Sequence, residues 1–171
     1  MKNIAKVIAV VALGCASTSS FAQATATASA SATIITPISI TKTVDMNFGN
    51  VAVSASNAGT AILAPGGTRT TGGAGGVTLP STTGTVAAAS FTVSGQASYT
   101  YAITLPSTAT ISSGSNTMTV NAFTSSPATT GALSTGGTQT LNVGATLNVA
   151  AGQAAGSYTN ATGVPVTVNY N

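Results

Sequence analysis

The chain has 171 residues, a length that suits one domain, and a formal net charge of +3 at pH 7. It contains no histidine and one acidic residue, Asp45, so the residue sets that paired-carboxylate or triad catalysis requires are missing. Zinc sites need Cys, His or carboxylate ligands and calcium sites need several charged oxygens, so we expect no enzyme, no metal and no cofactor.

Residues 1–22 have the pattern of a secretory signal peptide, with a short basic start, an apolar stretch and small residues near its end. We predict cleavage after Ala22, with Ala24 as the alternative, and export to the periplasm, the outer surface or the medium. Cys15, the one cysteine, is either a filler residue of this leader, which we favour, or a lipid attachment site. No other stretch is long and apolar enough for a transmembrane helix.

Removal of the leader would leave Lys42 and Arg69 against Asp45, a net charge of +1. A near-neutral chain lacks the basic surface that nucleic-acid binding requires, so no nucleic-acid partner is expected, and Arg69 is expected to be solvated. Lys42 and Asp45 also raise the idea of a covalent cross-link like those of some surface fibres. Because residues three apart in a regular strand point to opposite faces, that idea requires a bend.

Residues 23–33 alternate between alanine and serine or threonine, and a period of two is typical of a strand. The side chains are small, so a flexible linker and an extended segment that adds as a strand to a neighbouring subunit stay equally open. The candidate strand-exchange residues are Ala24, Ala26, Ala28, Ala30, Ala32 and Ile34.

Residues 34–171 are predicted to form a single antiparallel β-sandwich, immunoglobulin-like or pilin-like, with no helix. Apolar residues recur at every second position within short stretches bounded by Gly, Pro or Ser, as in the strands of a sandwich. The predicted strands are 34–48, 51–53, 86–94, 98–105, 116–123, 139–150 and 164–170. The glycine-rich region 66–76 is expected to be a loose loop, and residues 139–150 to be one long strand or two with a bend at Gly144.

The chain ends in a regular alternation that we identify as a candidate terminal partner strand, built into the sheet. Its inward-facing residues are Val164, Val166, Val168 and Tyr170. Most aromatic residues of the chain also lie at core positions of the predicted strands, which favours packing over a platform for sugar stacking.

Short motifs in a particular order give the chain a family resemblance. They lie at residues 38–42, 47–51, 136–145, 156–158 and 166–170. Together they resemble the bacterial family called domain of unknown function 4402, over essentially the whole mature chain. This resemblance implies a secreted β domain and carries no activity.

A more distant similarity is to the pilin subunits of chaperone–usher systems, particularly the spore-coat-U-like ones. It rests on Phe48-Gly49, on the Gly156–Tyr158 step and on the penultimate Tyr170. In those families a subunit lacks one strand, which a chaperone and then the next subunit's N-terminal extension supply by strand addition. The resemblance therefore implies self-association or a periplasmic chaperone and usher as partners, although the usual disulfide is absent.

These observations favour a secreted, non-catalytic structural or adhesive protein of the cell surface, including a pilus-like or fibre-like subunit that assembles by β-strand addition. The alternative is a carbohydrate- or matrix-binding β module, so a glycan ligand stays open. A small outer-membrane β-barrel is the weaker expectation, because 5% aromatic residues is thin for two interfacial girdles.

Overall fold

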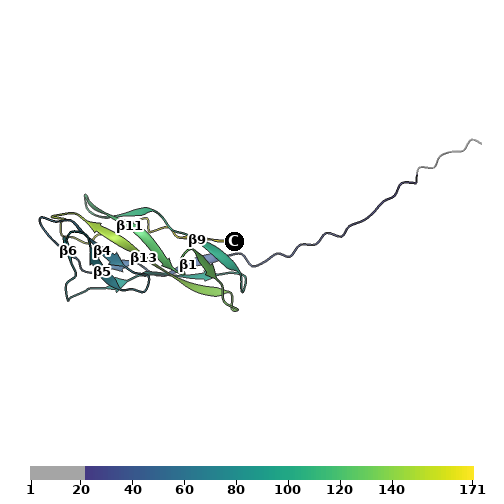
Figure 1. Cartoon of the computed structure of the whole chain (residues 1–171), viewed down its shortest axis with the longest axis horizontal. Coiled ribbons are helices and arrows are strands. Elements are labelled where there is room, and N and C mark those ends of the chain that lie inside the picture. Colours follow the sequence, from purple (N-terminus) through teal and green to yellow (C-terminus); the bar gives the residue numbers. More distant parts are fainter. Residues whose placement is uncertain (1–21) are drawn as a thin grey trace, which may run out of the picture. The chain divides into compact units, whose positions relative to one another are not determined.

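A computed structural model describes residues 22–171, and every regular element among them is a β-strand (Figure 1). The strands are β1 Ser39–Val44, β2 Asn47–Phe48, β3 Ala52–Val53, β4 Gly59–Leu63, β5 Arg69–Gly72, β6 Val77–Thr78, β7 Val86–Ala87, β8 Ala89–Ser94, β9 Thr100–Thr104, β10 Thr108–Ser113, β11 Asn116–Ser126, β12 Thr130–Ala132, β13 Thr138–Val149 and β14 Thr167–Tyr170. The prediction of an all-β fold is confirmed, and the narrower expectation of a sandwich stays a prediction.

The long strand β13 organises the larger sheet, in which seven strands pair antiparallel. One edge of β13 pairs with β11, which in turn pairs with β10. The other edge pairs first with β8 and then with β4, and the change of partner falls at Gly144, between Val143 opposite Ala89 and Ala145 opposite Leu63. The stretch predicted at 139–150 thus forms one strand, β13, which has two successive partners on this edge.

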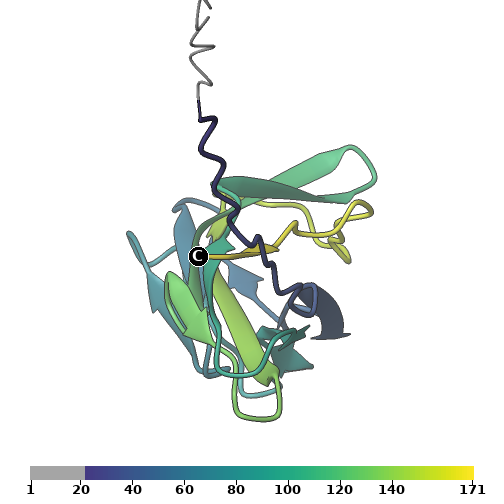
Figure 2. The ribbon, with the colours of Figure 1, turned by 90° about the vertical axis from the view of Figure 1, so that its right-hand side faces the viewer.

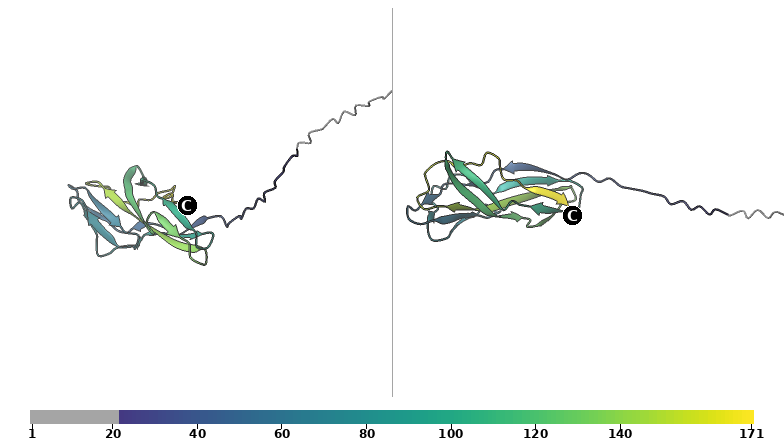
Figure 3. Two further views of the ribbon diagram at one scale, coloured as in Figure 1. Left: turned by 45° about the vertical axis from the view of Figure 1, so that its right-hand side comes forward. Right: turned by 90° about the horizontal axis from the view of Figure 1, so that it is seen from above.

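Three smaller pairings complete the fold. A second sheet has the order β12-β9-β14, and the short strands form the pairs β2-β7 and β3-β6. The last strand, β14, pairs with β9 from Thr167 opposite Thr104 to Tyr170 opposite Tyr101. Figure 2 looks onto the end of the domain where the chain terminates, and the right panel of Figure 3 shows β14 in yellow.

The core consists of two apolar clusters. In the first, side chains of β8 and β13 meet side chains of the smaller sheet and its flanking segment; its buried members are Ala89, Phe91, Val93, Tyr101, Leu133, Leu141, Val143 and Val168. The second is formed by side chains of β4, β6, β11 and β13; its buried members are Ala61, Val77, Val120, Ala145, Leu147 and Val149. Full burial of one large apolar side chain contributes about 1.5–3 kcal/mol, so these clusters dominate the stability of the fold.

Three expectations about strand positions were wrong. The predicted strand 34–48 begins only at Ser39 and is interrupted between Val44 and Asn47. The glycine-rich region 66–76 contains β5, which pairs with β4, and an added Cβ at Gly72 would lie 2.8 Å from the Thr60 Oγ1 atom. The absence of a side chain at Gly72 therefore leaves room for the Thr60 side chain of the paired strand β4. The terminal strand begins at Thr167 rather than Val164, because Pro165 has no N–H to donate to a ladder.

The compact unit comprises Ile34–Asn171, and residues 22–33 form no part of it. Those residues are exposed and contain no strand, turn or bend. The predicted leader and Cys15 fall on residues 1–21, outside the described part of the chain. Among residues 22–171, no helix is long and apolar enough to cross a membrane.

Candidate functional site

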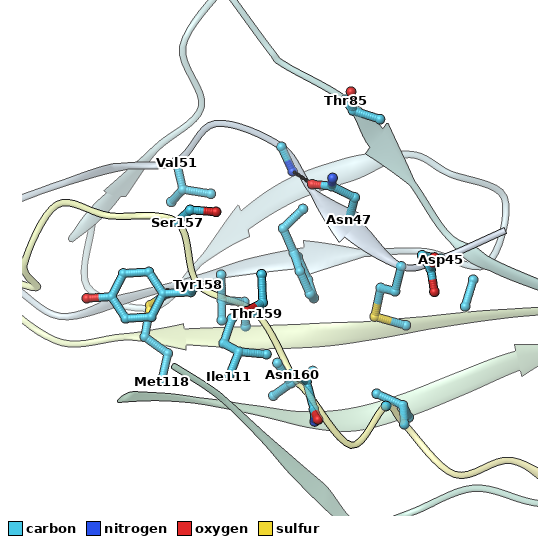
Figure 4. Close-up of a pocket in the computed structure, with 18 of the residues that line it drawn as sticks. Asp45, Asn47, Val51, Thr85, Ile111, Met118, Ser157, Tyr158, Thr159 and Asn160 are labelled. Atoms are coloured by element: carbon cyan, nitrogen blue, oxygen red, sulfur yellow. Dashed lines mark hydrogen bonds between the residues drawn. The ribbon is translucent and has the colours of Figure 1, made fainter. Parts of the chain in front are cut away.

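An open groove with a volume of about 1360 Å³ is lined mainly by apolar side chains (Figure 4). Its floor is made by side chains of the large sheet, including Phe91, Val120 and Leu147. Other apolar side chains that line it are only half-buried: Ile40, Met46, Phe48, Val51, Ile111, Met118, Val164 and Val166. Core residues are therefore left partly uncovered along this groove.

Two segments with unpaired backbone flank the groove. The first is β1, which is the last strand on its side of the sheet and pairs only with β8 in the described chain. The second is 160–166, whose backbone makes no hydrogen bond to another backbone segment of residues 22–171. An unpaired strand edge is a template for the addition of a further strand, so the groove offers hydrogen-bonding partners as well as apolar surface.

The wall beside β1 is held by Arg69, contrary to the expectation that this residue is merely solvated. Its Nη1 atom donates hydrogen bonds to the carbonyl oxygen of Phe48 and, at 2.7 Å, to that of Asn50. Gly49 between them has a φ of 66°, in the left-handed region that favours glycine. The Asn50 backbone N–H also donates to the Thr83 carbonyl at 2.7 Å. These contacts fix the segment that carries Met46, Phe48 and Val51 into the groove.

The opposite wall is held at one end by Tyr158. The Tyr158 hydroxyl donates to the Ala154 carbonyl at 2.8 Å and accepts a hydrogen bond from the Gln153 amide at 2.8 Å. Next to it, Thr159 and Ser112 exchange two backbone hydrogen bonds of 2.9 and 3.0 Å. Figure 4 shows this segment and the 45–51 segment on different sides of the groove. Beyond Thr159 the wall has no such pairing.

A bulge in β1 brings Lys42 and Asp45 together at the rim of the groove. The register of the strand shifts between Lys42 and Val44, and the Lys42 Nζ atom lies 2.5 Å from the Asp45 Oδ1 atom. This bulge is the bend that a contact between Lys42 and Asp45 requires. Both side chains are more than half exposed, and an exposed ion pair of this kind adds little to stability. This solvated environment does not supply the desolvation that amide formation between the two would need.

The predicted site residues fall into two groups. Ala24, Ala26, Ala28, Ala30 and Ala32 are exposed, and Ile34 is 96% exposed. In the terminal segment, Val164 and Val166 line the groove, Val168 is buried, and Tyr170 is half-buried in β14. The predicted terminal partner strand is thus divided between an unpaired groove wall and a short paired strand.

Sequence reasoning missed the other groove residues. Ile111 and Met118 face each other across the β10–β11 hairpin, and Met46 and Phe48 come from the wall beside β1. Alternation alone marks such residues as core, because it cannot tell a covered core position from an uncovered one. The available signal for β10 is the alternation of Ala109 and Ile111 with Thr108, Thr110 and Ser112, which is typical of a strand.

Ionisable chemistry is sparse in this site. Among residues 22–171, no three His, Cys, Asp or Glu residues are grouped so that they could hold a metal ion. Burial raises the pKa of Tyr101 above 10.0, but this residue belongs to the first core cluster and not to the groove. The groove therefore presents apolar side chains together with uncharged polar ones such as Asn47, Thr159 and Asn160, and Lys42 and Asp45 lie at its rim.

The fold and the groove define an all-β domain with an incompletely covered core. Residues 38–170, most of the chain, match the family model described as Domain of unknown function (DUF4402). The chain belongs to this family. No curated protein and no solved structure matches it significantly.

Proposed function

We propose that this chain is an exported, non-catalytic structural or adhesive protein of the bacterial cell surface, and that it assembles into fibres by β-strand addition. The observation that carries the proposal is the apolar groove between β1 and 160–166, two segments whose backbone groups have no partner across the groove among residues 22–171. A peptide strand suits this site because main-chain hydrogen bonds supply affinity while side-chain pockets supply specificity.

The occupant that the chain itself offers is the segment of residues 23–34. Its alternation would place the alanines and Ile34 on one face and the serines and threonines on the other. The apolar face would lie on the groove floor and the hydroxyl face toward water. Small alanine side chains allow the backbone of an added strand to lie deep between the two walls, and Ile34 supplies one large apolar group.

A glycan-binding module has less support from the described residues. Stacking on sugars needs exposed aromatic faces, and Tyr99, 45% exposed, is the one strongly exposed aromatic residue in the described chain. Its ring packs against Tyr170 in a T-shaped arrangement, with centroids 5.8 Å apart. A single ring held in this way is no extended platform, so strand addition remains the function that we propose.

The test compares the oligomeric state of residues 23–171 with that of a chain lacking residues 23–33, by size exclusion and negative-stain microscopy. We expect SDS-resistant ladders or filaments from the longer chain and monomers from the shorter one. The matched control replaces residues 23–33 by a Gly/Ser linker of equal length, which keeps the length but removes the alternation. A longer chain that stays monomeric at every concentration would overturn the proposal.

A further inference from the structure

Two methionines supply every sulfur atom of residues 23–171, and both side chains line the groove. The chain has three methionines and one cysteine, and Met1 and Cys15 precede residue 23, which leaves Met46 and Met118. Met46 belongs to the wall beside β1, and Met118 comes from β11 of the large sheet. Figure 4 shows Met118 and Asp45, the chain neighbour of Met46, toward different ends of the groove. The sulfur chemistry of residues 23–171 is therefore confined to one surface.

Both methionine side chains are half-buried, so they combine contact with the core and access from solvent. Met46 packs against both core clusters, and Met118 packs against the second cluster. Met118 also lines a second surface pocket, together with Thr117 and Gln153. A small molecule can therefore reach these side chains from the groove without unfolding of the domain.

Methionine suits a groove that has to fit the side chains of an occupant. Its unbranched thioether is flexible and polarizable, and it fills irregular gaps at binding surfaces. By contrast, Ile111, Val164 and Val166 of the same lining are β-branched and stiff at χ1. Met46 and Met118 are therefore the adaptable part of this lining, and a change in their chemistry acts directly on what the groove can bind.

We propose that Met46 and Met118 are a reversible modification site, at which peroxide makes the apolar groove partly polar and so prevents its occupation. In each reaction the sulfur atom is oxidised and forms a bond to one oxygen of the peroxide. The O–O bond breaks, and the other oxygen leaves as water with both peroxide hydrogens. The link to fibre assembly rests on the proposed function, whereas the modification itself does not.

The added oxygen acts on binding more than on folding. A sulfoxide is polar, unlike the thioether from which it forms. In the open groove the oxygen is solvated, but an apolar occupant would cover it without offering a hydrogen-bond donor. Burial of a polar group without a partner is costly, so the oxidised groove should bind apolar groups less tightly.

The composition of the chain makes the modification selective and reversible. Cysteine and methionine are the residues that pass through these oxidation states, and residues 23–171 contain no cysteine. The chain also has no tryptophan and no histidine. Peroxide should therefore add oxygen at the groove alone. Methionine sulfoxide reductases reverse the step, with one enzyme for each sulfoxide epimer; the oxygen leaves as water while two thiols are oxidised to a disulfide.

The experiment treats residues 23–171 with hydrogen peroxide and follows mass, dye binding and assembly. We expect a mass gain of two oxygen atoms, located at Met46 and Met118 by peptide mass spectrometry. The affinity for ANS, a dye that binds exposed apolar surface, should fall about tenfold at a protein concentration too low for assembly. Oligomers should be lost at higher concentration. Both reductases with a thiol should restore the starting values, and circular dichroism checks that the treated chain is folded.

The matched control replaces both residues by leucine, which is close to methionine in volume and has no sulfur to oxidise. Each chain is compared with itself before and after peroxide, so that any effect of leucine on the starting affinity is removed. The Met46→Leu, Met118→Leu chain should bind the dye equally before and after treatment. An equal loss of dye in both chains would place the effect elsewhere and overturn the inference, as would methionines that resist oxidation in the folded native chain.

Assembly and dye binding also separate this inference from the proposed function. If the native chain never assembles but loses the dye when both methionines are oxidised, the modification site stands and strand addition fails. If a folded, doubly oxidised chain assembles or binds the dye as before, the inference fails and strand addition is untouched. A native chain that neither assembles nor binds the dye would overturn both.

Discussion

Removal of the buried Tyr101 hydroxyl should lower the stability of the fold by a well-defined amount. The side chain is fully buried, and its hydroxyl donates to the Gln139 Oε1 atom at 2.7 Å, an oxygen that also accepts the Ala132 backbone N–H at 3.0 Å. Tyr101→Phe therefore removes one hydrogen bond without leaving an unpaired acceptor. We expect a loss of about 1 kcal/mol in the free energy of unfolding, measured by urea titration at neutral pH.

The same residue predicts the response to alkali. Burial raises the pKa of Tyr101 above 10.0, so this tyrosine ionises more readily in the unfolded chain than in the folded one. Stability should be unaffected below pH 10 and should fall as the pH rises above that value. Tyr101→Phe should reduce this fall, measured by urea titration at a series of pH values above 9. An unchanged alkaline profile in the Tyr101→Phe variant would contradict the account.

At the scale of the element, Gly144 allows one strand to serve two partners. An added Cβ would overlap the carbonyl oxygen of Leu63, at the point where β13 passes from β8 to β4. We expect Gly144→Ala to lower the free energy of unfolding by about 1–3 kcal/mol, as an overpacked core does. The matched control is Gly66→Ala, where an added Cβ has open space around it. Equal stabilities of the two variants, measured by urea titration, would contradict the steric argument.

The strands that were predictable are those whose own sequence carries the pattern. Leu141, Val143, Leu147 and Val149 alternate and are all buried, so β13 could be placed from local sequence alone. The strand β5 could not, because Thr70, Thr71 and Gly72 alternate weakly and become a strand by pairing with β4. Local pattern identifies strands that pack a face into the core, and it misses strands that are defined mainly by a partner.

At the scale of the whole molecule, the groove was beyond sequence reasoning for a related reason. It exists because, within residues 22–171, β1 pairs on one side only and the backbone of 160–166 has no partner across the groove. Both are properties of long-range pairing, which a period of two does not encode. The sequence did contain the candidate occupant, since the alternation of residues 23–33 is local, and it contained the Pro165 that interrupts the terminal ladder.

The charged side chains of residues 23–171 lead to a prediction for the molecule as a whole. It has no histidine, and its one carboxylate side chain, Asp45, is solvated beside Lys42. Histidine is the side chain whose charge ordinarily changes between about pH 5 and pH 8, and residues 23–171 contain none. The free energy of unfolding depends on pH only through groups that gain or lose protons. It should therefore be constant between about pH 5 and pH 8.

Urea titrations at intervals across that range would check this flat profile, and Asp45→Asn should leave it flat. The same argument applies to the proposed assembly, because the groove and the segment 23–34 would meet through apolar groups and backbone hydrogen bonds. Oligomer formation should therefore also be independent of pH between about pH 5 and pH 8 and nearly independent of salt, since few charges are present to be screened. Strongly salt-dependent assembly would mean that Lys42, Asp45 and Arg69 drive it, and that apolar strand addition does not.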